Sequence, residues 1–498
     1  MLKDRELHSA AELPPTVLTL FGSTGDLSLL YLLPTLVHMD RARLLPKTFR
    51  LVCVGRRDFS KQDFLDFAVK SQKSREKSRL DPGAPLTKKD WARFSRHVIY
   101  YKGNFEDPGS FAGLTRVIAD RKLSGSKHVC YNRLYYFATA PEFFSPIAKI
   151  LKSEGLLMGC TEHNRTVRVL LEKPFGTDLV SAKALNRLLL RFFDERQIYR
   201  IDHYLGKETV QNLLVARFAN DFLEPIWNAR YIDHVEISAL EPMGVESRGR
   251  FYDKTGAVKD FVQNHLLNVM ALIAIDKPKS LDPQDVRDRK VKVLRALKLC
   301  SPQALPELVA RGQYRGYHKD IGKKSSRTET FVAIKALLGL PRWKGVPFYL
   351  RTGKKLHVKS KLTEISVHFK KTGSGLFGDR AANVLSFQIQ PDERVQLRIN
   401  NKVPGFGIRL HAGSLEFGYK ANFNFEIPSA YERLLLDFME GDQRLFIRSD
   451  EVEAAWKFVD SIVKHWRNLP LEVYPPGSSG PKSAARLIER DGRRWWTK

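Results

Sequence analysis

The sequence has little cysteine and no long apolar run. Its four cysteines, Cys53, Cys130, Cys160 and Cys300, lie far apart among 498 residues and form no CxxC pair. This distribution argues against a disulfide framework and against a thiolate zinc site, so we expect a reducing, cytoplasmic setting. The N-terminal MLKDRELHSAAELPP has no apolar stretch of signal-peptide length, and nowhere do about 18 uncharged apolar residues run together. We therefore expect neither secretion nor a membrane span.

Acidic residues are few relative to basic ones. The chain has 83 Lys and Arg against 55 Asp and Glu, a formal net charge of +28. Such a charge attracts nucleic acid, anionic lipid or phosphorylated metabolites, and its sign alone does not choose among them. The basic clusters KSQKSREKSR (residues 70–79) and RDRKVKVLR (residues 287–295) lack the interleaved aromatic residues of a base-stacking surface. We interpret both as solvated surface charge, and a nucleic-acid partner is not expected.

The first 200 residues alternate short apolar runs with longer amphipathic stretches. This pattern is typical of a parallel sheet with helical crossovers, and such a sheet binds ligands beyond the carboxyl ends of its strands. At 498 residues the chain exceeds one ordinary core, which predicts two domains or one large mixed domain. The expected strands of the sheet are TVLTLFG (residues 16–22), FRLVCVGRR (49–57), RLYYFATAP (133–141) and TVRVLLEKPFG (166–176).

The pattern changes after about residue 200. Several alternating segments in close succession predict a mainly antiparallel sheet with helices against one face. We therefore expect an α/β plus α+β protein, with a Rossmann-like dinucleotide-binding domain at residues 1–200 and a larger α+β domain at residues 201–498. The second domain is predicted from two helical segments and three extended segments. The helical segments are TVQNLLVARFAND (209–221) and QNHLLNVMALIAI (263–275), and the extended segments are DHVEISALE (233–241), EISVHFKK (364–371) and NVLSFQIQPDERVQLRIN (383–400).

The loop GSTGDLS (residues 22–28) follows the first expected strand and precedes a helix-compatible segment. Glycines there let backbone amides approach a pyrophosphate, although this G-x-x-G pattern fits an ordinary strand-to-helix turn equally well. The second strand ends in VGRRD (residues 54–58), where an NAD-binding fold places a carboxylate for the ribose hydroxyl. Arg56 and Arg57 suit a 2′-phosphate instead, or simply solvate the strand end. Together these features favour NADP over NAD.

Basic and acidic side chains gather in RIDHYLGKE (residues 200–208), after the EKPFG turn that carries Lys173. If this segment is helical, His203 and Lys207 share a face and form a seat for a phosphate. Lys173 lies where its ammonium can reach the crevice above the sheet, although a lone lysine there is usually a surface residue.

Two later segments carry further candidates. YDKTGAVKDFVQNHLLN (residues 252–268) supplies Asp260 and His265 at the start of an apolar helix, where a histidine can also be a satisfied core residue. LRTGKKLHVKS (residues 350–360) places Lys354, Lys355 and Lys359 in a loop after an apolar strand. These lysines suit an anionic ligand, or they only face solvent.

Several of these segments together resemble the glucose-6-phosphate dehydrogenase family, and the resemblance runs essentially from end to end. It continues through YERLLLDFMEGD, DEVEAAW and the closing DGRRWW. The segments that carry it are EKPFG, RIDHYLGKETVQNLLVARFAN, EPIWN, YIDHVEI, the YDxxGAxxDxxQNHLL stretch and RTGKKL. The resemblance implies oxidation of D-glucose 6-phosphate to 6-phospho-D-glucono-1,5-lactone with hydride transfer to NADP, or more weakly to NAD, in the oxidative pentose phosphate pathway.

The resemblance also implies roles for individual residues. His265 would be the general base that takes the proton of the C1 hydroxyl, and Asp202 would orient it. His203, Tyr204 and Lys207 would bind the substrate phosphate, and Lys359 falls near a further basic contact. The sugar hydroxyls would be held by Lys173, Glu241, Asp260 and Lys354. The cofactor would be bound by Gly22, Ser23, Thr24, Gly25, Asp26, Leu27, Arg56 and Lys173.

The sequence departs from the family pattern at two positions. Tyr31 stands where the family usually has a lysine, and Lys259 stands where an arginine is common. The second change keeps the charge but loses the planar fork. The implied enzyme needs no metal, forms a homodimer or homotetramer, and binds NADP more weakly than usual. The alternative is an impaired, basic dehydrogenase-like protein that binds nucleotides or nucleic acid without catalysis.

Overall fold

The computed structural model describes residues 13–73, 85–119, 131–159, 166–371, 376–378, 380–423 and 427–496. The chain forms two compact units. The first comprises Met1–Gly176, Val180–Gly206 and Glu426–Ser449, and the second comprises Thr177–Leu179, Lys207–Phe425 and Asp450–Lys498. This division differs from a single boundary after residue 200, because a late segment of the chain belongs to the first unit. Among the described residues, no helix has the length and apolar character needed to cross a membrane.

The first unit contains a parallel sheet in the order β3-β2-β1-β4-β5-β6. This is the strand order of a Rossmann fold, as expected for this part of the chain. β1 and β2 are buried along their whole length, because helices cover both faces of such a sheet. The strands are β1 Thr16–Phe21, β2 Phe49–Gly55, β3 Val98–Lys102, β4 Asn132–Phe137, β5 Val167–Leu171 and β6 Ile198–Arg200.

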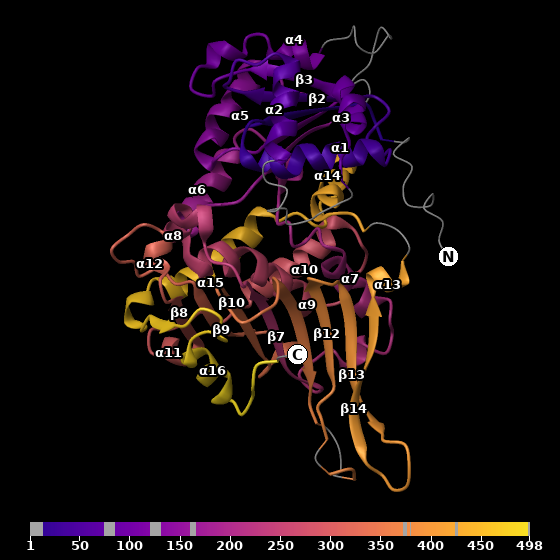
Figure 1. Cartoon of the computed structure of the whole chain (residues 1–498), viewed down its shortest axis with the longest axis vertical. Coiled ribbons are helices and arrows are strands. Elements are labelled where there is room, and N and C mark those ends of the chain that lie inside the picture. The colour runs from indigo at the N-terminus through magenta and orange to yellow at the C-terminus, as the bar shows by residue number, and fades with distance from the viewer. Residues whose placement is uncertain are drawn as a thin grey trace. The chain divides into compact units, whose positions relative to one another are not determined.

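The helices of the first unit include one from late in the chain. α14 contacts α1, and Figure 1 shows its orange ribbon beside the indigo α1. The Arg168 guanidinium on β5 donates to the carbonyls of Phe438 and Met439 at 3.0 and 2.9 Å, which ties α14 to the sheet. The helices, with η for 3-10 and π turns, are η2 Ser28–Leu32, α1 Leu33–Arg41, α2 Lys61–Lys73, α3 Lys88–Phe94, η4 Ser95–His97, η5 Pro108–Phe111, α4 Leu114–Ala119, η7 Pro141–Phe143, α5 Phe144–Ser153, α6 Leu179–Leu189, η8 Glu195–Gln197 and α14 Ala430–Glu440.

The second unit contains a nine-stranded sheet in the order β14-β13-β12-β11-β7-β10-β9-β8-β15. All neighbouring pairs are antiparallel except β7 with β10 and β8 with β15, which confirms the expected mainly antiparallel sheet. Figure 1 shows β13 and β14 as a long hairpin at one edge. The strands are β7 Ile232–Leu240, β8 Val309–Tyr314, β9 Phe331–Leu337, β10 Pro347–Gly353, β11 Leu362–Phe369, β12 Val384–Gln390, β13 Arg394–Lys402, β14 Leu410–Gly418 and β15 Glu472–Tyr474.

Helices of the second unit pack against this sheet. η11 contacts β10, and α7 contacts β12 and α9. Every residue of α9 is buried, in accord with its apolar sequence LNVMALIA. The helices are α7 Glu208–Phe218, η9 Glu224–Ile226, η10 Glu246–Arg248, α8 Gly249–Ala257, η11 Val258–Leu266, α9 Leu267–Ala274, α10 Pro283–Arg295, α11 Leu305–Leu308, α12 Tyr317–Asp320, η12 Pro341–Trp343, α13 Tyr419–Asn422, α15 Ser449–Val463, η13 Trp466–Asn468 and α16 Lys482–Glu489.

The basic cluster on α10 is partly buried, so its interpretation as solvated surface charge is wrong for two residues. Arg287 and Lys290 lie on the inner face of the helix with Leu294. Lys290 Nζ lies 2.7 Å from Glu451 Oε2 on α15, and both side chains are fully buried. Burial of charge at this depth requires such a partner. In the other cluster, residues 74–79 lie outside the described part of the chain.

Candidate functional site

The loop after β1 turns back against β2 at Gly22. Gly22 has a φ of 84°, and a Cβ built there would lie 2.5 Å from the Ala138 carbonyl oxygen. Only glycine fits this position, because both the left-handed backbone and the close approach exclude a side chain. The amides of Gly22 and Ser23 donate to the Val54 carbonyl at 3.2 and 3.1 Å, which holds the loop against β2.

The rest of the loop leads into the helical segment formed by η2 and α1. The Ser28 hydroxyl donates to the Gly22 carbonyl at 2.9 Å, and the Gly25 amide donates to the same carbonyl at 3.0 Å. Gly25 and Asp26 are exposed, so their backbone lies open at the start of the helix, where an anion is favoured. Tyr31, in place of the usual lysine, lies in η2, and the centroid of its ring lies 6.1 Å from the ring centroid of Tyr431.

Two arginines follow β2, and the structure places them differently. The Arg57 guanidinium lies 4.5 Å above the Phe67 ring of α2. Arg56 is exposed and makes no cation–π contact, hydrogen bond or ion pair within the described part of the chain. Arg56 is therefore the more available of the two for a phosphate.

Near the carboxyl end of β5, Glu172 and Lys173 lie close to Asp202. The Tyr136 hydroxyl donates to Glu172 at 2.6 Å. Burial raises the pKa of the Glu172 carboxyl, while the Tyr136 hydrogen bond and the charge of Lys173 lower it and Asp202 raises it further. Sequence reasoning named Lys173 and Asp202 but missed Glu172, whose only signal was its place beside the lysine.

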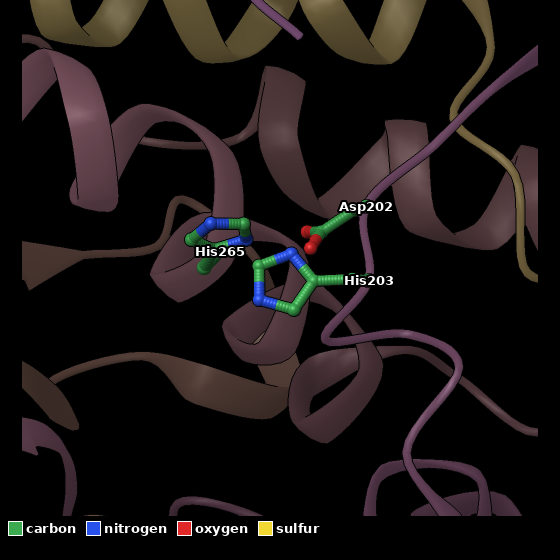
Figure 2. Close-up of side chains that lie close together, drawn as sticks. All are labelled: Asp202, His203 and His265. Carbon is green, nitrogen blue, oxygen red and sulfur yellow. The ribbon is translucent and has the colours of Figure 1, made fainter. Parts of the chain in front are cut away.

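The segment after β6 forms a turn rather than a helix. The Tyr204 amide donates to Asp202 Oδ1 at 2.9 Å, and the Leu205 amide donates to the Asp202 carbonyl at 3.0 Å. Asp202 is 1% exposed, and the His203 ring packs edge-on against Tyr204 with centroids 4.9 Å apart. Asp202 and His203 leave this segment next to one another (Figure 2). An aspartate that bonds the backbone two residues on favours such a turn over a helix.

Lys207 is the residue before α7 and has an extended backbone, with φ of −76° and ψ of 136°. The premise that His203 and Lys207 share one helical face is therefore wrong. Lys207 Nζ donates to Gln390 Oε1 on β12 at 3.4 Å, which holds the side chain within the second unit.

Glu241 follows β7 and forms an ion pair with Lys354, which follows the neighbouring strand β10. Lys361 Nζ lies 3.3 Å from the same carboxylate, and Lys354 Nζ lies 5.1 Å from the Tyr252 ring centroid. Burial alone would raise the pKa of Glu241, but the two ammonium groups hold it below its usual value. Lys359 is exposed. The lysine that contacts Glu241 besides Lys354 is Lys361, which the sequence did not single out.

Asp260 and His265 both lie on the π-helical segment η11. His265 is 1% exposed, and its ring packs edge-on against Phe261 with centroids 4.9 Å apart. Figure 2 shows the imidazole leaving a helical turn. Asp260 Oδ1 lies 3.9 Å from an Arg248 guanidinium nitrogen, and Lys259 Nζ donates to the Thr177 carbonyl at 3.0 Å. π-helical turns are rare and frequently occur at functional sites.

One further group in the second unit has the composition of a metal site. His234, Glu236 and His368 are buried together, with each histidine Nε2 3.3 or 3.2 Å from Glu236 Oε1. The two imidazole rings are stacked, however, with centroids 4.0 Å apart and planes 13° from parallel. One ion cannot lie in the planes of both rings, as the ring lone pairs require. The group is better described as a buried ion pair between Glu236 and His234, whose pKa is raised by hydrogen bonds from the ring to Asp233 and Glu236 against the effect of burial.

Comparison with known proteins matches both units. The family model described as glucose-6-phosphate dehydrogenase, NAD binding domain, matches residues 19–212, and the C-terminal domain model of the same family matches residues 214–496. Among curated relatives, glucose-6-phosphate 1-dehydrogenase of Mycolicibacterium smegmatis is 41% identical, with 97% of each chain covered. The Chlamydia pneumoniae protein of the same name is 39% identical, covering 98% of this chain and 97% of the relative.

Solved structures agree with this match. A glucose-6-phosphate dehydrogenase in complex with its substrate glucose-6-phosphate superposes with a TM-score of 0.87 at 33% identity, covering 97% of this chain and 99% of the other. The glucose-6-phosphate 1-dehydrogenase of Mycobacterium avium gives a TM-score of 0.84 at 33% identity, covering 98% and 99%. The match therefore extends over both sheets and the loops that carry the candidate residues, and the chain belongs to the glucose-6-phosphate dehydrogenase family.

Proposed function

We propose that the chain is an NADP-dependent oxidoreductase that converts D-glucose 6-phosphate to 6-phospho-D-glucono-1,5-lactone, the first NADPH-producing step of the oxidative pentose phosphate pathway. The observation that carries this proposal is the match of both units to one family, including a relative solved with glucose 6-phosphate. The candidate residues after β1, after β5, on η11 and in the loop after β10 provide the types of group that the reaction needs.

In the proposed reaction, His265 accepts the proton of the C1 hydroxyl while the hydride on C1 leaves toward the nicotinamide. NADP, when bound, supplies the hydride acceptor. Asp202 accepts a hydrogen bond from His265, orients the ring and stabilises its protonated form. The burial of both side chains supports this assignment, since a carboxylate that is 1% exposed needs donors and polarises a histidine strongly.

The substrate is proposed to be held at two ends. His203, Tyr204 and Lys207 bind its phosphate, with Lys359 as a further basic contact. The sugar hydroxyls are held by Lys173, Glu241, Asp260 and Lys354, and the Glu241–Lys354 ion pair offers an acceptor beside a donor. Because the phosphate lies far from C1, its binding energy can position C1 for hydride transfer.

The cofactor is proposed to lie on the loop from Gly22 to Leu27, with its 2′-phosphate on Arg56. Two features of the loop support a pyrophosphate there: Gly22 keeps the backbone free of a side chain, and Asp26 lies exposed at the start of a helix. Lys173 lies beyond the end of β5, at the edge of the sheet where a Rossmann fold binds its cofactor.

Gly22→Ala is expected to lower the apparent free energy of unfolding by about 2–4 kcal/mol and to raise the KM for NADP. The new Cβ adds left-handed backbone strain and overlaps the Ala138 carbonyl. Urea unfolding and steady-state kinetics measure the two effects. Gly155→Ala is the matched control, because Gly155 also has a positive φ, of 65°, but has open space around its Cβ position. Equal effects of the two substitutions would contradict the close approach at Gly22.

Arg56→Ala is expected to raise the KM for NADP about tenfold or more and to leave the KM for NAD nearly unchanged. A hydrogen bond to a charged phosphate contributes about 1.5–3 kcal/mol, and NAD has no 2′-phosphate. Arg57→Ala serves as the control, because that guanidinium packs on Phe67. If Arg56→Ala weakened both cofactors equally, the assignment of the 2′-phosphate to Arg56 would be wrong.

One steady-state assay tests the proposed function. The purified chain is mixed with glucose 6-phosphate and either NADP or NAD, and other sugar phosphates are compared, while absorbance of the reduced nicotinamide is followed. We expect turnover with glucose 6-phosphate, faster with NADP. No turnover with either cofactor, together with a salt-sensitive shift of DNA or RNA, would favour the non-catalytic alternative.

We further propose that the chain acts in the cytoplasm and as a homodimer or homotetramer. The reducing setting is supported by the two described cysteines, Cys53 and Cys300, which are buried and unpaired. Sedimentation velocity at several protein concentrations measures the oligomeric state.

A further inference from the structure

η11, the segment that carries Asp260 and His265, begins at a break in the helix. Gly256, at the end of α8, has φ of 66° and ψ of 178°, so the backbone leaves the helical conformation just before η11 starts. A Cβ built on Gly256 would lie 2.3 Å from Glu329 Oε1. The backbone of the break therefore lies directly against the Glu329 carboxyl group.

Glu329 holds the junction between α8 and η11 in two ways. The Val258 amide donates to Glu329 Oε1 at 3.1 Å, and the Ala257 amide donates to the Glu329 carbonyl at 3.2 Å. Glu329 is 4% exposed and lies two residues before β9. A buried carboxylate that accepts from the first amides of a helix fixes where that helix begins.

We propose that Glu329 is a positioning residue for the proposed reaction, fixing the start of η11 against β9 and thereby the places of Asp260 and His265. The inference rests on the roles proposed above for those two residues. Val258 is only two residues before Asp260 and seven before His265, so a shift at the Glu329 contact moves both side chains together. A misplacement of about 1 Å can cost about 10²-fold in rate.

The surroundings of Glu329 make its charge sensitive to pH. Burial raises the pKa of the Glu329 carboxyl to about 7, while the Val258 amide, the charge of Arg311 on β8 and Trp466 on η13 lower it. The phenols of Tyr252 on α8 and Tyr317 on α12 also face it. Above about pH 7 the carboxylate accepts a charge-assisted bond from Val258, and below that pH the neutral acid accepts a weaker one.

The beginning of η11 also lines a cavity of about 270 Å³. Val258 and Glu329 lie on its wall together with the cationic side chains of Lys254, Lys259 and Arg327, and with Asp253. This space adjoins Val258, so the start of η11 has room to move on that side if the Glu329 contact is lost.

The test compares Glu329→Ala and Glu329→Gln with a matched control in the same unit. Glu472 also accepts two backbone amides at the start of a helix, from Lys482 at 2.8 Å and Ser483 at 2.9 Å, but its helix α16 carries no proposed site residue. Glu472→Ala therefore loses the same kind of helix contact without touching η11. Steady-state kinetics from pH 6 to 8 and amide hydrogen exchange of residues 256–266 are measured for each protein.

We expect Glu329→Ala to lower kcat 10- to 100-fold and to raise amide exchange in residues 256–266, while the KM for NADP changes less than twofold. Glu329→Gln keeps an acceptor for Val258, so its kcat should stay within about threefold of the wild type. The ratio of wild-type to Glu329→Gln kcat should rise between pH 6 and pH 8, as the wild-type carboxyl ionises. Glu472→Ala should leave kcat unchanged.

The inference is overturned if folded Glu329→Ala keeps wild-type kcat and wild-type exchange in residues 256–266, or if Glu472→Ala loses as much kcat. A wild type without turnover would count against the proposed function instead. In that case the exchange of residues 256–266 still decides whether Glu329 fixes the start of η11.

Discussion

His265→Asn is expected to lower kcat by about 10²–10⁴-fold while changing the KM for glucose 6-phosphate only slightly, because asparagine offers polar atoms but accepts no proton. The side chain is 1% exposed, so water has little access to replace the lost base. Steady-state kinetics measure the loss. A primary isotope effect with substrate deuterated at C1 should become larger in the variant, since the chemical step then limits turnover.

His203→Asn provides the control for this prediction, because His203 is proposed to bind the phosphate. It is expected to raise the KM for glucose 6-phosphate about tenfold, with a much smaller fall in kcat. The assignment of the base to His265 would be reversed if His203→Asn gave the larger loss of kcat and His265→Asn the larger rise in KM. Asp202→Asn should resemble His265→Asn, since it leaves the histidine without its orienting carboxylate.

Lys290→Met is expected to lower the free energy of unfolding by about 3–5 kcal/mol, because it leaves the fully buried Glu451 carboxylate without its ammonium partner. Thermal or urea unfolding measures the change. Lys292→Met on the same helix is the control: Lys292 pairs with Asp276 at 2.8 Å but is 54% exposed, so its loss should cost less than about 1 kcal/mol.

A double variant separates the buried charge from the packing of the side chains. Lys290→Met with Glu451→Leu removes both charges, and we expect it to recover most of the lost stability, because two apolar side chains can replace a buried ion pair. If the double variant is no more stable than Lys290→Met alone, the loss comes from the packing of the side chains rather than from the uncompensated Glu451 charge.

Four of the six strands of the first sheet could be predicted from the sequence, because each of the four is a continuous apolar run that ends in a turn; β3 was not among them. β1, β2 and β5 lie within the expected segments, β4 begins one residue before its expected segment, at Asn132, and the loop after β1 has the glycine that its backbone requires. β6 has three residues and β15 has three, which is too short for a periodic signal.

What the sequence could not predict depends on contacts between distant segments. Lys290 has the sequence context of a solvated lysine, and only its partner Glu451 on α15 explains its burial. The membership of α14 in the first unit likewise depends on Arg168 and on α1, far earlier in the chain. Lys361 was missed because the route of the loop after β10 decides which lysine reaches Glu241.

The candidate catalytic residues were found by resemblance, and local reasoning alone would have chosen differently. The spacing in RIDHYLGKE pairs His203 with Lys207 if the segment is helical, whereas the structure has a turn held by Asp202. The wrong premise came from side-chain spacing, which says nothing about the competing bond from the Asp202 carboxylate to the backbone.

The late return of the chain to the first unit affects how the protein is made. Gln443 donates to the Ile198 carbonyl at 3.1 Å, and the Ile447 amide donates to the Arg200 carbonyl at 3.1 Å, so residues 427–449 complete the edge of the parallel sheet at β6. Domains usually fold in order as they leave the ribosome, the N-terminal one first. Here that order cannot be completed, because the first unit lacks its last helix, α14, until residue 440 has been made, and lacks its last segment until residue 449 of 498.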